Sequence, residues 1–391
     1  MTSSWSKTCP SYKSNMSKAT IIESLPDELI FEILVRVPAQ NLYDSTRLVC
    51  RKWYNMINTR NFAHSHLQRS TPGLISVDLY NLPSCKQTLM TMQKGQIETS
   101  NLSYGFGGTI FSSCNGLILG FNRNKNSNER SYIIVNPVTK QHFALPRSHS
   151  FNCYFSLSYV ASSGEYKVVS SLYSDRENRD LVCVIMTVGV DTDFVRRVST
   201  QHLSLKAKEF LYWFPLTTPG FVHWVPRNSI FECVLTMNVE SEIITQIPGP
   251  CLHDDGKSLR CHYLPMGSYL SLLIDRGEFL WEVWKMKPET GEWTNMPRIV
   301  LESQKVINHL SSKFKSLGST TLLLKPFGWS NSYSGEVLFF GVDSHFRDGR
   351  RVNTGIFVVY NIRTREFDSS YPQDANSNLC LDHKSSLVWL D

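Results

Sequence analysis

The 391-residue sequence has no run of about 18 apolar residues, so it offers no segment that would cross a membrane as a helix. Its first residues, Met-Thr-Ser-Ser-Trp-Ser-Lys, lack the apolar stretch of a secretory signal. Its ten cysteines are scattered singly, without a Cys-x-x-Cys pair, which is typical of reduced thiols and not of a disulfide framework. We therefore expect a protein of the cytoplasm, the nucleus or both, with no membrane partner.

Strong charge imbalance is also lacking, since 40 Lys and Arg residues face 34 Asp and Glu residues for a formal net charge of +6. No basic stripe with interleaved aromatic residues is present, and the sequence therefore predicts no nucleic-acid partner. The first 21 residues are polar and contain three lysines but no acid. We expect residues 1–21 to form a disordered tail.

Signals of catalysis are scarce. The glycine-rich segment 105–109 is not followed by Gly-Lys-Ser or Gly-Lys-Thr, so it does not predict a phosphate-binding loop. Residues of the kinds that bind metals gather further on, at Cys251, His253, Asp254, Asp255, Cys261 and His262. They lack the paired ligands at regular short spacing that a zinc site needs. The sequence thus predicts no catalytic, cofactor-binding or metal-binding residue, and we expect a protein that is not an enzyme.

The clearest helical pattern lies in residues 24–57. Leu29, Ile33 and Val37 share one helical face, and Pro38 ends that helix. A second helix is predicted to carry Leu42, Val49, Trp53 and Ile57 on one stripe. So short a unit buries its own apolar surface poorly. The segment therefore indicates either a docking device or an ordinary helical hairpin of the protein core.

The residues of this segment resemble the F-box. Leu25-Pro26, Asp27-Glu28-Leu29-Ile30, Arg36-Val37-Pro38 and Val49-Cys50-Arg51-Lys52-Trp53 stand at the spacing of that motif, and the match covers residues 22–65. Gln40 and Thr46 depart from the commonest plant pattern. The resemblance implies binding to a Skp1-like adaptor and, through it, to a cullin-RING ubiquitin ligase. The residues that it assigns to the adaptor are Leu25, Pro26, Leu29, Ile33, Leu34, Val37, Pro38, Leu42, Val49 and Trp53.

From Leu74 onward the pattern becomes strand-like, with Val, Ile, Phe, Tyr and Trp runs between Gly, Asn, Asp, Ser and Pro turns. Only residues 301–315 could hold a short helix. A strand-turn-strand unit recurs at 133–146, 184–194, 234–248, 283–297 and 357–367. The turns of these units are mostly about 50 residues apart, which is the period of kelch-type propeller blades. We expect five blades, or six if residues 74–110 form another.

This second region resembles the plant F-box-associated domain. The segments that carry the resemblance are 113–118, 135–140, 166–169 and 221–224. The resemblance implies a kelch-like propeller that recognises a target protein. Trp213, Phe214, Phe327 and Trp329 are candidates for exposed aromatic residues at the target surface, with packing in the core as the alternative.

Together these observations predict an α+β multidomain chain. Its expected parts are a tail (1–21), a small all-α F-box (22–65), a linker (66–73) and a mainly β, kelch-like propeller domain (74–391). The predicted function is substrate recognition in a Skp1-cullin-F-box ubiquitin ligase, with an unknown target protein. Two alternatives remain: an adaptor-bound regulator or scaffold outside a ligase, and a propeller-type ligand-binding protein or enzyme.

Overall fold

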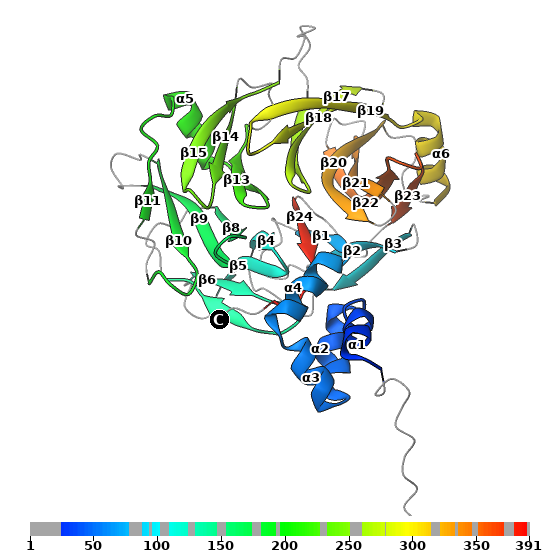
Figure 1. Cartoon of the computed structure of the whole chain (residues 1–391). Helices are drawn as coiled ribbons and strands as arrows, with labels where there is room; N and C mark the ends of the chain where they lie inside the picture. The colour runs from blue at the N-terminus through cyan, green and yellow to red at the C-terminus, as the bar shows by residue number, and fades with distance from the viewer. Residues whose placement is uncertain are drawn as a thin grey trace, which may run out of the picture.

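The structure of the chain is a computed structural model. It describes residues 25–77, 88–93, 96–101, 109–123, 130–146, 154–173, 181–192, 196–226, 233–250, 260–277, 279–313, 321–332, 335–345, 351–370 and 379–388. Within them a small helical region packs beside a ring of six β-sheets, as Figure 1 shows. A short helical region followed by a mainly β propeller is thus confirmed, whereas the predicted tail lies outside the described residues.

The N-terminal helical region (residues 25–69) is built from short pieces. They are α1 (Asp27–Leu34), α2 (Ala39–Asp44), a single 3-10 turn (Thr46–Leu48), α3 (Arg51–Ile57) and α4 (Arg60–Arg69). The first helix begins as expected, with Pro26 at its N-cap and acidic residues in its first turn, where the helix dipole favours them. The prediction that it extends through Val37 to Pro38 is wrong, because it ends at Leu34 and Pro38 is the N-cap of α2. The prediction of one continuous second helix is wrong. Ser45 (φ −133°) and Cys50 (φ −156°, ψ 164°) have non-helical backbones and divide that stretch.

The predicted polar linker (residues 66–73) is half helix, because α4 runs to Arg69, and the last two linker residues belong to β1 (Pro72–Val77). Thr59 caps α4 by accepting a hydrogen bond from the Phe62 backbone at 3.2 Å, and the helix buries Phe62, His66 and Leu67. His66 reads as polar in the sequence, yet its Nε2 lies 2.8 Å from the Val37 carbonyl oxygen, which makes its burial tolerable. Only residues 70 and 71 therefore separate α4 from the first strand.

The propeller has six four-stranded antiparallel blades, one more than the minimum expected. Blade one contains β24 (Leu379–Lys384), β1 (Pro72–Val77), β2 (Thr88–Gln93) and β3 (Gln96–Asn101). Blade two contains β4 (Ile110–Cys114), β5 (Leu117–Arg123), β6 (Arg130–Val135) and β7 (His142–Ala144). Blade three contains β8 (Phe155–Val160), β9 (Glu165–Tyr173), β10 (Leu181–Thr187) and β11 (Arg196–Val198).

The other three blades follow the same order from the centre outward. Blade four contains β12 (Leu216–Thr218), β13 (Phe221–Trp224), β14 (Cys233–Asn238) and β15 (Ile243–Pro248). Blade five contains β16 (Arg260–Met266), β17 (Tyr269–Gly277), β18 (Leu280–Lys287) and β19 (Glu292–Val300). Blade six contains β20 (Thr321–Ser332), β21 (Gly335–His345), β22 (Arg351–Asn361) and β23 (Phe367–Ser370).

The two ends of the β region close the ring together. Strand β24 pairs with β1 from Pro72↔Lys384 to Val77↔Leu379, so the last strand is the innermost strand of the first blade. The innermost strands of neighbouring blades then contact one another around the whole ring. This pairing removes two free strand edges, which would otherwise invite aggregation.

Each pair of neighbouring blades shares its own apolar core. Six clusters of buried side chains lie one at each blade-to-blade contact, and a seventh lies in the helical region. Trp224, Trp281 and Trp329 are among the largest fully buried side chains. Since each strand presents side chains to both neighbouring blades, the strands read as nearly continuous apolar runs.

The repeated unit found in the sequence is the outer hairpin of a blade. In blades two, four and six the Asn side chain at the end of the third strand accepts hydrogen bonds from the second and third residues that follow it. The fourth residue after each Asn, Lys140, Glu242 or Arg365, then has φ near +60°. In blade five Gly291 holds the same position, at φ 72°. The sequence repeat is thus a repeated turn.

Two helices lie outside the blade pattern. They are α5 (Leu205–Lys208), followed by a 3-10 turn (Glu209–Tyr212), and α6 (Ser303–Lys313), which falls within the expected range 301–315. Val306 and Leu310 of α6 pack into the core shared by blades five and six. No helix among the described residues has the length and apolarity that a membrane span requires.

Candidate functional site

A group of large apolar side chains stands on the surface of the helical region. Leu29 and Ile33 on α1 are 51% and 50% exposed, and Leu48 and Val49 before α3 are 68% and 60% exposed. An ion pair between Asp27 and Lys52 joins the start of α1 to α3. Exposed apolar side chains gathered in one small region are typical of a protein-binding surface.

The ten residues predicted to contact an adaptor divide into three groups in the structure. Leu29, Ile33, Val49, Pro26 and Pro38 are exposed; Leu25, Val37 and Trp53 are partly buried; Leu34 and Leu42 are buried. The last two pack against Ile30 and Ile57 in the core of the helical region. They shape the surface from below and are not part of it.

Sequence reasoning missed Leu48 and Tyr54, which is 47% exposed. Leu48 precedes Val49 directly, and the break in the expected helix turns both side chains outward. In one continuous helix Leu48 would lie off the apolar stripe. Its exposure can therefore be predicted only once the boundaries of the 3-10 turn and α3 are known.

The helical region and the propeller share one apolar core. Val138 in the turn after β6 and Leu387 after β24 are 4% and 2% exposed and pack against Ile30 and Leu34. The Tyr43 hydroxyl donates a hydrogen bond to the Thr139 carbonyl oxygen at 2.9 Å across the same junction. The helical region is therefore held in a fixed position on the ring.

The segment after β24 lies between the helical region and the propeller. Asn136 Nδ2 donates to the carbonyl oxygens of Ser386 and Val388 at 3.1 and 2.9 Å, and Ser386 Oγ donates to the Asn115 carbonyl oxygen at 2.7 Å. Gly116 (φ 85°) lies so close that an added Cβ would fall 2.0 Å from Ser386 Oγ. Only glycine fits there.

The two faces of the ring differ in their connections. The face that meets the helical region, here the near face, carries the tight turns within blades, such as Asn115-Gly116 and Pro219-Gly220. On the opposite face, here the far face, strands are joined by longer segments, among them 199–215 and the segment that starts with residues 301–313. In propellers and other scaffolds, binding residues concentrate on such longer connections.

A central channel holds a cavity at each end. The cavity toward the near face has a volume of about 650 Å³ and is bordered by His64, Leu67 and Gln68 of α4. The cavity toward the far face has a volume of about 460 Å³ and is lined by residues of the inner strands β4, β12, β16, β20 and β24. Ser113, Thr217, Pro265 and Asp382 line both cavities.

All four residues predicted for target binding line the far-face cavity. Trp213 is 37% exposed and Phe214 is partly buried. For Phe327 and Trp329 the alternative of core packing holds, because they are 7% and 2% exposed and pack between blades. Trp329 Nε1 donates to Ser271 Oγ at 2.8 Å, which anchors the indole in the wall of the cavity.

Titratable groups of the channel are perturbed by burial. Burial raises the pKa of Asp382 to about 7, because protein surrounds the channel on all sides although the side chain keeps accessible area within it. Burial lowers the pKa of its neighbour His383 to about 4, and His383 Nδ1 lies 2.9 Å from Ser113 Oγ. His383 is thus neutral at pH 7. Its contact with Ser113 joins the inner strands β24 and β4 and is structural.

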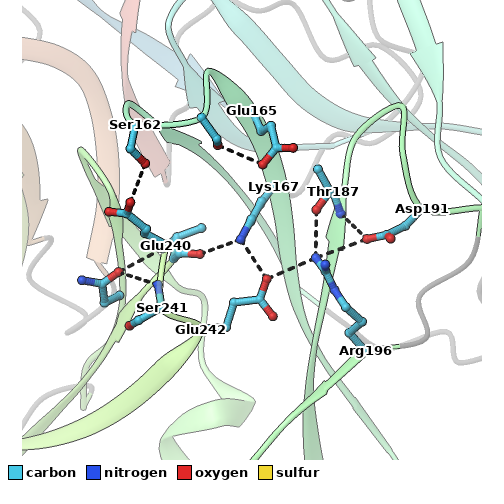
Figure 2. Close-up of polar contacts among 12 residues, drawn as sticks. Ser162, Glu165, Lys167, Thr187, Asp191, Arg196, Glu240, Ser241 and Glu242 are labelled. Carbon is cyan, nitrogen blue, oxygen red and sulfur yellow. Dashed lines mark hydrogen bonds and ion pairs between the residues drawn. The ribbon is translucent and has the colours of Figure 1, made fainter.

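A polar network joins blades three and four on the near face (Figure 2). Lys167, 7% exposed, donates to Glu242 Oε1 at 2.8 Å and to the Val239 carbonyl oxygen at 3.1 Å. Arg196 reaches Glu242 and Asp191, each at 3.2 Å, as Figure 2 shows. Lys167, Arg196, Glu242 and Asp191 each have a partner of opposite charge, so we assign the network to the blade contact and not to catalysis.

One further histidine is buried in blade four. Buried His223 lies between the hydroxyls of Thr218 and Thr236 at 2.9 and 3.0 Å, which explains it as a structural histidine. Residues 251–255 and 105–108 lie outside the described residues, and no group of three or more metal-binding side chains occurs among the residues that the structure does describe.

Family models match both regions of the chain. The model of the F-box-associated β-propeller domain matches residues 73–342, more than half of the sequence, and the model of the F-box domain matches residues 22–65. The chain is an F-box protein with an F-box-associated β-propeller.

Relatives of this F-box protein are found in Arabidopsis thaliana. F-box protein At5g49610 is 22% identical over 310 residues, which cover 71% of this chain and 79% of that protein. F-box protein At3g08750 is 45% identical over 58 residues, or 14% of this chain and 15% of that protein. Probable F-box protein At5g47300 is 24% identical over 226 residues, or 51% of each chain. The chain thus spans about half or less of the length of several relatives that it matches.

Solved structures that resemble this F-box protein are distant. Pseudomonas aeruginosa periplasmic gluconolactonase PpgL is 12% identical, with a TM-score of 0.35 over 81% of this chain and 98% of that one. Kuenenia stuttgartiensis hydrazine synthase is 9% identical, with a TM-score of 0.35 over 68% of this chain and 66% of that one. These likenesses carry no argument about function.

Proposed function

We propose that this F-box protein is the substrate-recognition subunit of a Skp1-cullin-F-box ubiquitin ligase. Its F-box would bind a Skp1-like adaptor, and its propeller would bind a target protein. One observation carries the proposal: the exposed apolar group of Leu29, Ile33, Leu48 and Val49 stands on a helical region that the propeller holds in place.

The size of this apolar group suits a stable protein contact. Complete burial of one large apolar side chain is worth roughly 1.5–3 kcal/mol. A few such side chains at the centre of an interface can dominate binding. Ion pairs of Glu32 with Arg69 (2.6 Å) and of Asp27 with Lys52 link α1 to α4 and α3 beside this group.

The first test is adaptor binding by a variant that changes exposed residues alone. Ile33→Lys with Val49→Lys should abolish co-purification with a co-expressed Skp1-like adaptor, because it places two charges in the apolar contact. The matched control is Val300→Lys, which changes a residue of β19 that is 59% exposed and far from the F-box in Figure 1. Undiminished adaptor capture by the double variant would refute the proposed contact.

The second test separates a ligase subunit from a scaffold. The purified complex of this protein with its adaptor should recruit a cullin and its RING partner, and failure to do so would favour a regulator acting outside a ligase. In the proposed role the chain presents the target while other subunits transfer ubiquitin. It would work in the cytoplasm, the nucleus or both.

A further inference from the structure

The far-face cavity combines a wall of polar, apolar and aromatic residues with a charged mouth. It lies inside the ring, and its volume of about 460 Å³ falls within the range of built binding sites. The partly buried Phe214 contributes aromatic surface to its wall, in which the largely buried rings of Tyr263, Phe327 and Trp329 also lie. Such a wall accepts a large apolar or aromatic side chain, since aromatic rings bury much area with little loss of conformational entropy.

Positive charge lies at the mouth of this cavity. The Lys325 side chain is exposed, lines the cavity and places Nζ 5.3 Å from the centre of the Phe327 ring. Arg260, also exposed, begins the inner strand β16 on the far face. Burial, together with the charges of Lys325 and Arg260, lowers the pKa of His262 to about 4, so this histidine is neutral at pH 7.

The single carboxylate among the described lining residues lies deeper. Asp382 occupies the innermost strand β24 and borders both cavities of the channel. Because burial raises its pKa to about 7, its negative charge is reduced at neutral pH and offsets the charges of Lys325 and Arg260 only in part. The mouth is therefore net positive, and aromatic side chains form part of the wall behind it.

We propose that this cavity binds an extended segment of the target in which a large aromatic or apolar residue lies next to an acidic one. This inference rests on the proposed function and names the class of target. The aromatic or apolar side chain enters the cavity between Phe214 and Trp329, and the acidic side chain pairs with Lys325 at the mouth. Lys325 sets the charge preference of the site.

The rim favours a peptide over a small aromatic acid. Trp213 is 37% exposed, and Tyr154, whose ring centre lies 5.2 Å from that of Phe214, is 40% exposed. These rings extend the apolar surface outward beyond the cavity, along the connections of the far face. A ligand that fills the cavity alone leaves this outer surface uncovered, whereas a peptide chain crosses it.

The experiment is selection from a random twelve-residue peptide library displayed on phage, with the full-length protein as bait. Three baits are compared: the native chain, Lys325→Glu and Lys287→Glu. The last is the matched control, because Lys287 is also exposed but ends β18 on the near face. Thermal unfolding of each bait confirms that these surface changes leave the protein folded.

The native chain and Lys287→Glu should enrich peptides with Asp or Glu beside Phe, Trp, Tyr or Leu. Lys325→Glu should lose these peptides and enrich ones with Lys or Arg in the acidic position. A synthetic peptide from the native selection should bind Lys325→Glu at least tenfold more weakly in fluorescence anisotropy. Its affinity should also fall with added salt, as a charge contact requires.

Several results would overturn the inference. They are enrichment of the same peptides by all three baits, enrichment of none by the native chain, and full displacement of the synthetic peptide by an equal concentration of phenylacetate. The last result would assign the cavity to a small aromatic acid. Adaptor capture by the same baits is measured in parallel, so intact capture without peptide selection refutes this inference and leaves the proposed F-box function standing.

Discussion

Between Leu29 and Tyr54 the F-box exposes five large apolar side chains, whereas the far longer propeller exposes eight over its described part. Those eight are spread over several blades and over α5 and α6, and the six blade contacts bury the rest. The F-box lacks enough chain to bury its own apolar residues, and it borrows Val138 and Leu387 from the propeller to complete its core. The apolar surface that stays outside is what a partner can cover.

The contacts that hold the F-box in place also lie apart from the aromatic cavity. A shared core and the hydrogen bonds around Ser386 fix the F-box on the near face of the ring. The aromatic cavity opens toward the other face. A partner on the F-box and a segment in the cavity would therefore occupy separate surfaces of one rigid body.

The largest expected effect comes from removing the propeller's contribution to the F-box core. Leu387→Ala should destabilise the F-box by about 2–5 kcal/mol, the usual cost of truncating a buried leucine. Hydrogen exchange should show faster exchange of the buried amides of α1 and α4, while the blade amides that lie far from the junction keep their protection. The matched control is Val300→Ala, an exposed change expected to stay within about 0.5 kcal/mol of the native chain. Unchanged exchange in α1 and α4 would mean that the F-box core is independent of the propeller.

The next largest effect concerns the Asn turn, which in blade two also contacts the C-terminal segment. Asn361→Ala in blade six removes hydrogen bonds to Arg363 and Thr364, a loss of about 1–3 kcal/mol at 0.5–1.5 kcal/mol per bond. Asn136→Ala removes the equivalent bonds and also those to Ser386 and Val388, so the loss should be roughly twice as large. Denaturant unfolding measures both. Equal losses would show that the Asn136 contacts to the C-terminal segment add no stability.

These turns explain why much of the propeller is visible in the sequence. The Asn residues at 136, 238 and 361 fix a turn by contacts within four residues, so a local pattern marks them. The first helix is predictable for the same reason, because Pro26, the acidic first turn and the apolar face are all local.

Other features depend on distant residues and could not be predicted. The pairing of β24 with β1 joins strands that are about 300 residues apart, and it decides both the sixth blade and the closure of the ring. Leu34 and Leu42 repeat at helical spacing like Leu29 and Ile33, and only the packing of the helices with one another and with the propeller determines which of them are buried. The burial of Phe327 and Trp329 could be predicted only from the positions of the neighbouring blades, because their strand is apolar on both faces.

A third effect is the loss of stability at acidic pH that is caused by a histidine buried in the propeller. Burial lowers the pKa of His223 to about 3, below its ordinary 6.5. The folded state then binds fewer protons than the unfolded state, so its stability is full above pH 6.5 and falls as the pH drops toward 3. His223→Gln keeps hydrogen-bonding groups between Thr218 and Thr236 and should reduce this pH slope, although His262 and His383 still contribute. Urea unfolding at pH 7, 6 and 5 tests it, and an unchanged slope would contradict the assignment.

The smallest effect has the opposite sign and lies in the channel. Burial raises the pKa of Asp382 from 3.8 to about 7, so the folded state binds more protons than the unfolded state between these values. The stability due to Asp382 is therefore full below about pH 4 and is lost as the pH rises through 7. Asp382→Asn removes the ionisation and should be more stable than the native chain at pH 8 but not at pH 4. The gain should be modest, because accessible area in the channel lets solvent screen the charge. His223 and Asp382 change the free energy of unfolding with pH in opposite directions. Urea unfolding of both single variants and of the double variant across pH 4–8 therefore separates the contribution of the buried blade interior from that of the channel wall. Equal stability of Asp382→Asn and the native chain at pH 8 would show that the channel is wet enough to keep this carboxylate ionised at little cost.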